Sequence, residues 1–141
     1  MVLYETDFYD WANQQGVALE SGRFDILDMH NIIEEIFSLA KSEKFSLESY
    51  IERLIAHLLK EKFQPENNCK SWKRSILDSR IKIQRILRNS PSLKRFIPEI
   101  IKDEYPHAIN WASQETELPI DHFPKECPWS IEEILNVKGD K

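Results

Sequence analysis

WKRSILDSRIKIQRIL, residues 72–87, combines a strong positive charge with a helical period in a chain whose net charge is −5. Apolar side chains that recur every three or four residues mark the side of an α-helix that packs on its neighbours. That side is formed here by Trp72, Ile76, Ile83, Ile86 and Leu87. Arg80 lies only about 65° from its middle, whereas Arg74 and Lys82 point well away from it. The stretch therefore predicts a packed helix with one cation at the edge of the core.

The same helical period continues on both sides of this stretch. It predicts helices over about 4–19, 25–44, 46–64, 69–89 and 98–116. The second of these is expected to bury an apolar face made of Met29, Ile32, Ile33, Ile36, Phe37 and Ala40. The polar residues 41–44 (KSEK) are expected to end it. Ser46 then suits the N-cap of the third helix, and Phe45 is expected to pack on Tyr50 as a hydrophobic staple.

Composition marks the turns and the C-terminal segment. Gly22 suits a left-handed cap at the end of the first helix, and QPENNC (64–69) is typical of a turn. The segment ELPIDHFPKECPWS (117–130) holds three prolines, which predict an extended strap across the helices. We expect it to be anchored by Leu118, Ile120, Phe123 and Trp129. SIEE (130–133) is a capping box that predicts a short final helix.

These elements define an all-α protein. Three successive long helices with short connections predict antiparallel neighbours. We therefore expect an antiparallel bundle of three long helices, with additional shorter helices and an extended C-terminal strap. One domain is expected over residues 1–141, with its core at about 4–135. The chain has only three glycines, which disfavours β-sandwiches, barrels and phosphate-binding loops.

Several classes of protein are disfavoured by what the sequence lacks. No apolar run approaches the ~20 residues that span a bilayer, and the acidic, aromatic N-terminus is unlike a signal peptide. Cys69 and Cys127 do not make a disulfide framework. His122 and Cys127 lack a second pair at the spacing of a zinc site. We therefore expect a cytoplasmic protein that uses no membrane, metal or cofactor.

The net charge conceals a segregation of charge along the chain. Residues 69–102 carry ten basic and two acidic side chains, whereas the segments before and after them are acidic. Such a basic block can attract an external polyanion, or it can face acidic segments of its own fold. We expect the internal arrangement. The candidate contacts for a nucleic acid are Lys70, Lys73, Arg74, Lys82, Arg85 and Arg88.

A buried arginine requires a carboxylate partner, because a guanidinium keeps its charge at ordinary pH. Glu35 flanks the apolar face of the helix expected at 25–44 and is the best candidate to pair with Arg80. His57 flanks the face of the next helix, and Trp72 can supply an apolar wall. We expect these residues to form a structural polar network. The alternative is a site, because an acid, a base and a cation in one cleft resemble acid–base machinery.

Five motifs follow one another in a characteristic order: YETDFYDWA, IIEEIFSLAKSE, HLLKEKFQPE, SW with SPSL, and FPKECPW. Between about Tyr4 and Leu135 the chain thereby resembles a bacterial, largely cyanobacterial family of domains of unknown function, number twenty-nine. The resemblance implies a small helical domain in the cytoplasm and no assigned activity, so no catalytic residue carries over. Two positions depart from the family's pattern. Glu117 replaces an expected glycine at a left-handed position, and Pro106 interrupts a regular helix.

Taken together, these features favour a non-enzymatic protein-binding or regulatory module, such as an adaptor or an antitoxin-like partner. We expect an unidentified protein partner and a monomer or homodimer. The first alternative is a small enzyme or a metal- or ligand-binding protein that uses Glu35, His57 and Arg80. The second is nucleic-acid binding through the basic helix at 70–95. No catalytic residue is assigned, because neither a nucleophile motif nor a reactive cysteine signature occurs.

Overall fold

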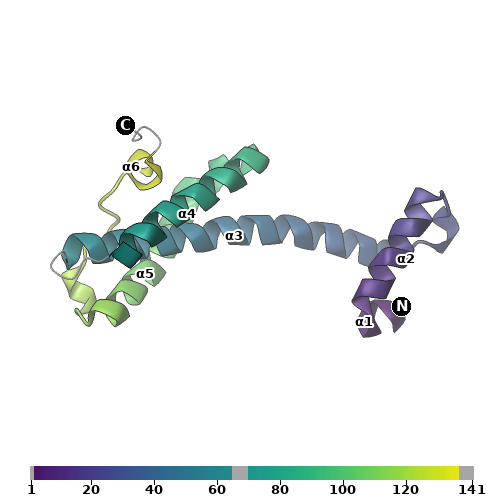
Figure 1. Cartoon of the computed structure of the whole chain (residues 1–141), viewed down its shortest axis with the longest axis horizontal. Helices are drawn as coiled ribbons and strands as arrows, with labels where there is room; N and C mark the ends of the chain where they lie inside the picture. The colour runs from purple at the N-terminus through teal and green to yellow at the C-terminus, as the bar shows by residue number, and fades with distance from the viewer. Residues whose placement is uncertain (1, 65–69, 137–141) are drawn as a thin grey trace. The chain divides into compact units, whose positions relative to one another are not determined.

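The computed structural model describes residues 2–64 and 70–136, and all of its regular elements in these ranges are helical (Figure 1). The all-α prediction is therefore confirmed. The chain forms two compact units, one over residues up to Ser42 and the other from Glu43 onward. The turn expected at 64–69, including Cys69, lies almost entirely outside the described residues.

The first unit holds α1 (Val2–Thr6), α2 (Phe8–Glu20), the short 3-10 helix η1 (Phe24–Ile26) and the start of α3. Asp7 separates α1 from α2 because its side chain accepts a hydrogen bond from the Asp10 backbone N–H at 3.0 Å, which caps α2. Trp11 is buried, and its indole N–H donates to Asp28 Oδ2 at 2.9 Å. Gly22 has φ +74°, as its predicted role in a left-handed cap requires.

The two helices expected at 25–44 and 46–64 are in fact one helix, α3 (Met29–Phe63). The expected break, the Ser46 cap and the Phe45–Tyr50 staple are therefore wrong. The physical reason is that KSEK contains neither glycine nor proline, and its lysines and glutamate are good helix formers. Lys44 also forms an i,i+4 ion pair with Glu48 at 3.7 Å, which supports the helix beyond the predicted stop.

The second unit contains the rest of α3, then α4 (Lys70–Asn89), the 3-10 helix η3 (Pro91–Phe96) and α5 (Ile97–Thr116). Figure 1 shows α4 and α5 alongside the C-terminal part of α3, and one hydrophobic core joins all three. Its fully or almost fully buried members include Leu47, Ile51, Leu54, Ile55, Leu59, Ile83, Ile97, Ile100 and Ala108. The long helices of this core are thus α3, α4 and α5, and not the three expected from the sequence.

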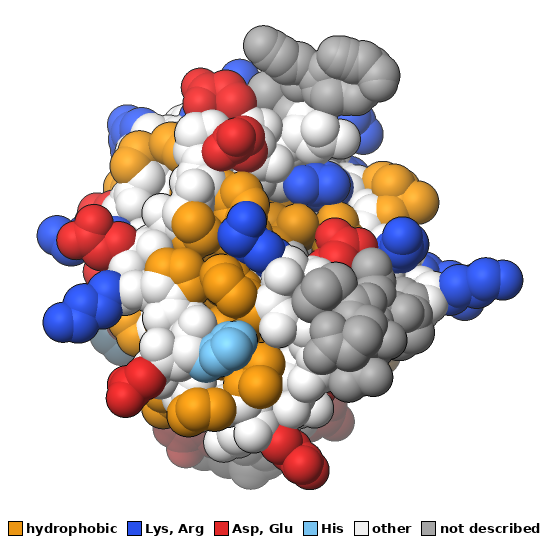
Figure 2. Space-filling view, turned by 90° about the vertical axis from the view of Figure 1, so that its left-hand side faces the viewer, with side chains coloured by type: hydrophobic (Ala, Val, Ile, Leu, Met, Phe, Trp, Pro, Cys, Tyr) orange, Lys and Arg blue, Asp and Glu red, His pale blue; other side chains and the backbone are white. Residues whose placement is uncertain are grey.

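The strap after α5 contains η4 (Ile120–His122) and leads to α6 (Ile131–Leu135). Phe123 is buried, and the hydroxyl of Tyr105 donates to the Pro124 carbonyl at 2.7 Å, which ties the strap to α5. Ile120 does not anchor the strap, because 53% of it is exposed. Figure 2 views the chain from the left-hand side of Figure 1 and shows hydrophobic side chains gathered near the middle of this face, with charged ones both among and around them.

Two local predictions near the strap are confirmed. Ser130 and Glu133 form the capping box of α6, with each side chain accepting a hydrogen bond from the other's backbone N–H. Glu117, at the end of α5, has φ 64° and ψ 16°, which is the left-handed conformation that favours glycine. α5 continues through Pro106 as a single helix.

Replacing Glu117 with glycine is expected to stabilise the protein. The left-handed conformation costs a residue with a Cβ atom on the order of 1 kcal/mol relative to glycine. Glu117→Gly should raise the free energy of unfolding in urea by about that amount, as measured by circular dichroism. Asn136 also has positive φ, at 58°, and asparagine tolerates this conformation better, so Asn136→Gly should change stability less. An equal gain at both positions would contradict this account.

Candidate functional site

Among the described residues, the most deeply buried charged side chain is that of Lys60, which is 1% exposed. Lys60 lies near the end of α3, and its ammonium donates a hydrogen bond to Glu115 of α5 and forms an ion pair with it. The indole N–H of Trp111, one turn before Glu115, donates to the other carboxylate oxygen at 3.0 Å. The carboxylate is thereby held between α3 and α5 by two donors.

Aromatic rings complete the surroundings of the Lys60 ammonium. Its Nζ atom lies 5.5 Å from the ring centroid of Trp72 and 6.0 Å from that of Trp111, within the range of cation–π attraction. The His57 ring meets Trp111 edge to face at 5.7 Å. His57 Nδ1 lies 2.9 Å from the Arg53 carbonyl, which can only accept, so Nδ1 carries the proton. We call Lys60, Glu115, Trp111, Trp72 and His57 the lysine cluster.

The lysine cluster shifts the pKa values of two of its members. The hydrogen bond from Lys60, followed by its charge, lowers the pKa of the Glu115 carboxyl. Burial lowers the pKa of His57, and the nearby charge of Lys60 acts in the same direction. A shallow hollow on the surface reaches Trp111 and Glu115, but Lys60 does not line it. The arrangement is that of a polar network that joins two helices, with the ammonium buried and the carboxylate at the surface.

Arg80 is not held by a carboxylate hydrogen bond of the kind expected. Its Nε atom donates to the Ile134 carbonyl at 2.8 Å, and a terminal nitrogen donates to the Glu133 carbonyl at 3.1 Å. Both carbonyls belong to the last turn of α6, where backbone acceptors lack helical partners and a positive charge is favourable. Burial lowers the pKa of Arg80, and the negative charge of Glu61 opposes that shift. Arg80 therefore fastens α6 to α4.

The predicted network is thus divided among three sets of contacts. His57 and Trp72 belong to the lysine cluster, Arg80 binds α6, and Glu35 lies in the first unit. There the Glu35 carboxylate accepts a hydrogen bond from the Tyr4 hydroxyl, which raises the pKa of Tyr4 to about 12.

Sequence reasoning missed Lys60 and Glu115. Lysine is rarely buried, so a lysine near the end of a helix gives little reason to place it in the core. One signal was present: residues 54–59 (LIAHLL) are apolar on nearly every side of the helix, which indicates burial all round. Lys60 follows this turn directly. Its burial could have been inferred from that position, although its partner could not.

The candidate nucleic-acid contacts differ in their surroundings. Lys82 forms an ion pair with Asp78 at 3.4 Å and lies over the Tyr50 ring at 5.6 Å, so it is engaged within the fold. The others, Lys70, Lys73, Arg74, Arg85 and Arg88, are exposed. Two apolar side chains lie among them, Leu77 at 60% and Ile81 at 46% exposure. We call Lys70, Arg74, Leu77, Ile81, Arg85 and Arg88 the α4 outer face.

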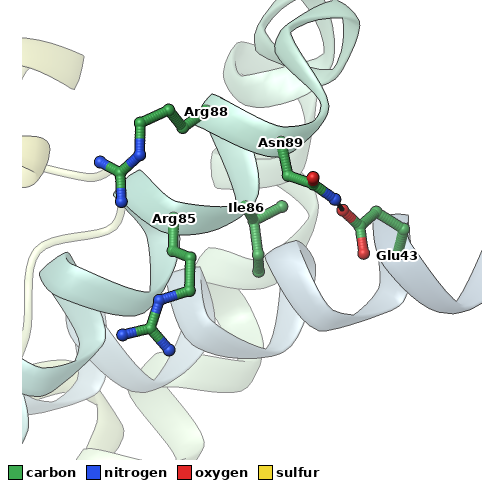
Figure 3. A pocket seen from close by; sticks show the side chains of 5 residues that line it. All are labelled: Glu43, Arg85, Ile86, Arg88 and Asn89. Carbon is green, nitrogen blue, oxygen red and sulfur yellow. Dashed lines mark hydrogen bonds between the residues drawn. The ribbon is translucent and has the colours of Figure 1, made fainter.

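A second hollow lies at the end of α4 and is lined by Glu43, Arg85, Ile86, Arg88 and Asn89. Figure 3 shows Asn89 turned toward Glu43, with Ile86 between that pair and the two guanidinium groups. Asn89 and the Ser90 hydroxyl both donate to the Glu43 carboxylate, at 3.2 and 2.8 Å. The arginines and the carboxylate therefore do not converge on one point where a small ligand could bind.

The first unit exposes an apolar face that the sequence placed in the core. It is formed by Met29, Ile33, Ile36, Phe37, Leu39 and Ala40, and we call it the 29–40 face. Exposure reaches 60% at Ile36, 64% at Phe37 and 70% at Leu39. With Ile32, which is half-buried, these residues cover about 160° of the helix surface. Beside one border of it, Glu35 accepts a hydrogen bond from Tyr4 of α1, and Asp28 accepts one from Trp11 of α2.

Residues 3–138 match the model of a family described as a domain of unknown function, DUF29, and the chain therefore belongs to that family. Neither the curated proteins nor the solved structures include a significant match. Within residues 2–64 and 70–136, no three histidine, cysteine, aspartate or glutamate side chains gather closely enough to hold a metal ion. No helix in the same ranges combines the length and the apolar character needed to cross a membrane.

Removing the carboxylate of Glu115 is expected to destabilise the protein through Lys60. Glu115→Gln leaves a buried ammonium without its counter-charge, which should lower the free energy of unfolding by on the order of 2 kcal/mol. Lys60→Met combined with Glu115→Gln should recover most of that loss, because the buried charge is removed together with its partner. Urea unfolding of both variants followed by circular dichroism measures the effect. A double variant as unstable as Glu115→Gln would contradict this role of Lys60.

The lysine cluster should make the fold less stable in acid. A His57 pKa below its ordinary value of 6.5 means that the unfolded chain binds the proton more readily, so stability falls as the pH drops below about 6.5. The lowered pKa of Glu115 adds a further loss below its ordinary value of 4.5, as the pH approaches the lowered value. His57→Gln should reduce the fall in the free energy of unfolding between about pH 7 and pH 5, as measured by urea unfolding. An unchanged slope would show that His57 does not titrate on unfolding.

Proposed function

We propose that this member of the DUF29 family is a protein-binding module whose 29–40 face binds a basic amphipathic helix of its partner. The exposure of that face is the observation that carries the proposal. Burying one large apolar side chain contributes roughly 1.5–3 kcal/mol, and the 29–40 face holds five such side chains. Contiguous apolar surface of this kind on a folded protein is typical of an interaction site.

The shape of the 29–40 face favours a helical occupant. Met29, Ile33, Ile36 and Ala40 follow one another at steps of four, three and four residues along α3. This spacing forms the straight ridge of side chains that packs against a second helix. Recognition of an amphipathic helix through such anchors is a common mode of peptide binding.

The charge of the first unit favours a basic occupant. Residues 1–42 carry eight acidic and only two basic side chains. Opposite charge around an apolar contact speeds association and discriminates against acidic competitors. A regulatory role as an adaptor or an antitoxin-like partner is compatible with this mode of binding.

The alternative functions have less support. For an acid–base site, Glu35, His57 and Arg80 each have different hydrogen-bond partners. Nucleic-acid binding through α4 stays a prediction, which the exposed arginines favour. However, the exposed apolar side chains of Leu77 and Ile81 lie between the cations of the α4 outer face. Contact with a phosphate backbone depends on charge and does not require such apolar side chains.

The proposal is tested with a synthetic helix of leucine and lysine that has one apolar and one basic face. The full-length protein should bind this peptide, and a matched leucine–glutamate peptide should bind at least about tenfold more weakly, as measured by calorimetry. Phe37→Asp should abolish binding because it replaces a large exposed apolar side chain of the 29–40 face with a charge.

Ser38→Asp is the matched control, since it adds the same charge to the same helix on its polar side. Its affinity for the leucine–lysine peptide should stay within a factor of about two to three of the original protein. If Phe37→Asp and Ser38→Asp bind the peptide equally well, the 29–40 face is not the binding surface.

A further inference from the structure

We infer that the basic helix bound by the 29–40 face is α4 of a second copy of this chain. This inference rests on the proposed function and names its partner. It combines two surfaces that the fold leaves exposed, the 29–40 face in the first unit and the α4 outer face in the second. The contact joins different surfaces of the two copies, so each copy offers one surface of each kind.

The two surfaces have matching side-chain spacing. On α4, Lys70, Arg74, Leu77, Ile81 and Arg88 lie along one line, with steps of four, three, four and seven residues. The 29–40 face has steps of four, three and four. Two helices with this spacing can pack side by side with their ridges interleaved. Leu77 and Ile81 would then meet the apolar centre of the 29–40 face, with cations at both ends of the α4 outer face.

Charge decides which surfaces pair. α4 carries seven basic side chains and one acidic side chain, whereas residues 1–42 carry eight acidic and two basic ones. Pairing two 29–40 faces would bring two acidic units together, and pairing two α4 outer faces would bring two basic helices together. Like charges placed across an interface are strongly unfavourable. The mixed contact avoids both repulsions and places acidic and basic surfaces opposite each other.

A hollow beside the α4 outer face offers room for a large side chain. It is lined by Leu77, Ile81, Gln84 and Arg88 of α4, with Arg80 beneath and Leu135 and Asn136 at the end of α6. Arg80 fixes this end of α6 by binding its last carbonyls. An aromatic side chain such as Phe37, which is 64% exposed in its own unit, suits such a half-apolar hollow.

The test uses two full-length variants, each of which lacks one surface. Phe37→Asp disables the 29–40 face and leaves the α4 outer face intact, and Ile81→Asp does the reverse. In sedimentation velocity the original protein should self-associate as its concentration rises. Each variant alone should stay monomeric, whereas an equal mixture should form a one-to-one complex through the single intact contact. Added salt should weaken that complex.

Ser38→Asp and Ser92→Asp are the matched controls, because they add the same charge to exposed positions outside both surfaces. Both should associate like the original protein, and circular dichroism checks that all four variants are folded. Dimerisation of Ile81→Asp on its own would overturn the inference in favour of pairing between two 29–40 faces. The inference would also be overturned if the unsubstituted protein stayed monomeric. If that monomeric protein bound a DNA duplex in a salt-dependent manner, the partner of the α4 outer face would be a nucleic acid.

The leucine–lysine peptide separates failure of the inference from failure of the proposed function. If the original protein stays monomeric but binds the peptide through Phe37, the partner is another protein and only the inference falls. If the protein neither self-associates nor binds the peptide, both fall.

Discussion

The backbone hydrogen bonds of α3 continue through residues 41–44, and this continuity determines what the rest of the chain can bury. Residues 46–63 continue the same helix, so they do not form the separate helix that was expected to follow a turn at 41–44. The core of the second unit is completed by α4, α5 and the strap instead. The 29–40 face is left exposed in a unit whose buried residues, among those described, are Trp11 and Ala18. The apolar surface available for binding is thus a direct result of the missing turn.

The cations of the second unit fall into two groups with different physical roles. Lys60, Arg80 and Lys82 have partners within the fold: a carboxylate, two carbonyls of α6 and the side chain of Asp78. The partners of Lys60 and Arg80 come from other helices, so these two residues help to fix how the helices pack. Asp78 lies on the same helix as Lys82. The cations of the α4 outer face remain exposed to solvent. Within the basic block at 69–102, Arg80 and Lys82 have partners inside the fold, although these are backbone carbonyls and Asp78 of the block itself, and not acidic side chains of the flanking segments.

The sequence predicted local structure well wherever short-range chemistry decides it. The capping box at Ser130, the positive φ of Gly22 and the left-handed Glu117 each depend on a few neighbouring residues, and all three are confirmed. The break at 41–44 was wrong because polarity alone does not end a helix made of lysine, serine and glutamate. A helical wheel shows which side of a helix a residue occupies, but not which residue of another helix lies opposite it. His57 and Trp72 were expected beside Glu35 and Arg80, whereas the structure places Trp72 by Lys60 and His57 by Trp111. Lys60 and Glu115 were not singled out.

The distribution of the four tryptophans has a spectroscopic consequence. Trp11 lies in the first unit, whereas Trp72, Trp111 and Trp129 lie in the second. The Trp11 ring is buried against Tyr4 and Phe8, at centroid distances of 4.7 and 5.5 Å. A chain that keeps only this indole would report through its fluorescence on the first unit alone. The opening of that unit could then be followed by emission without a contribution from the three tryptophans of the second unit.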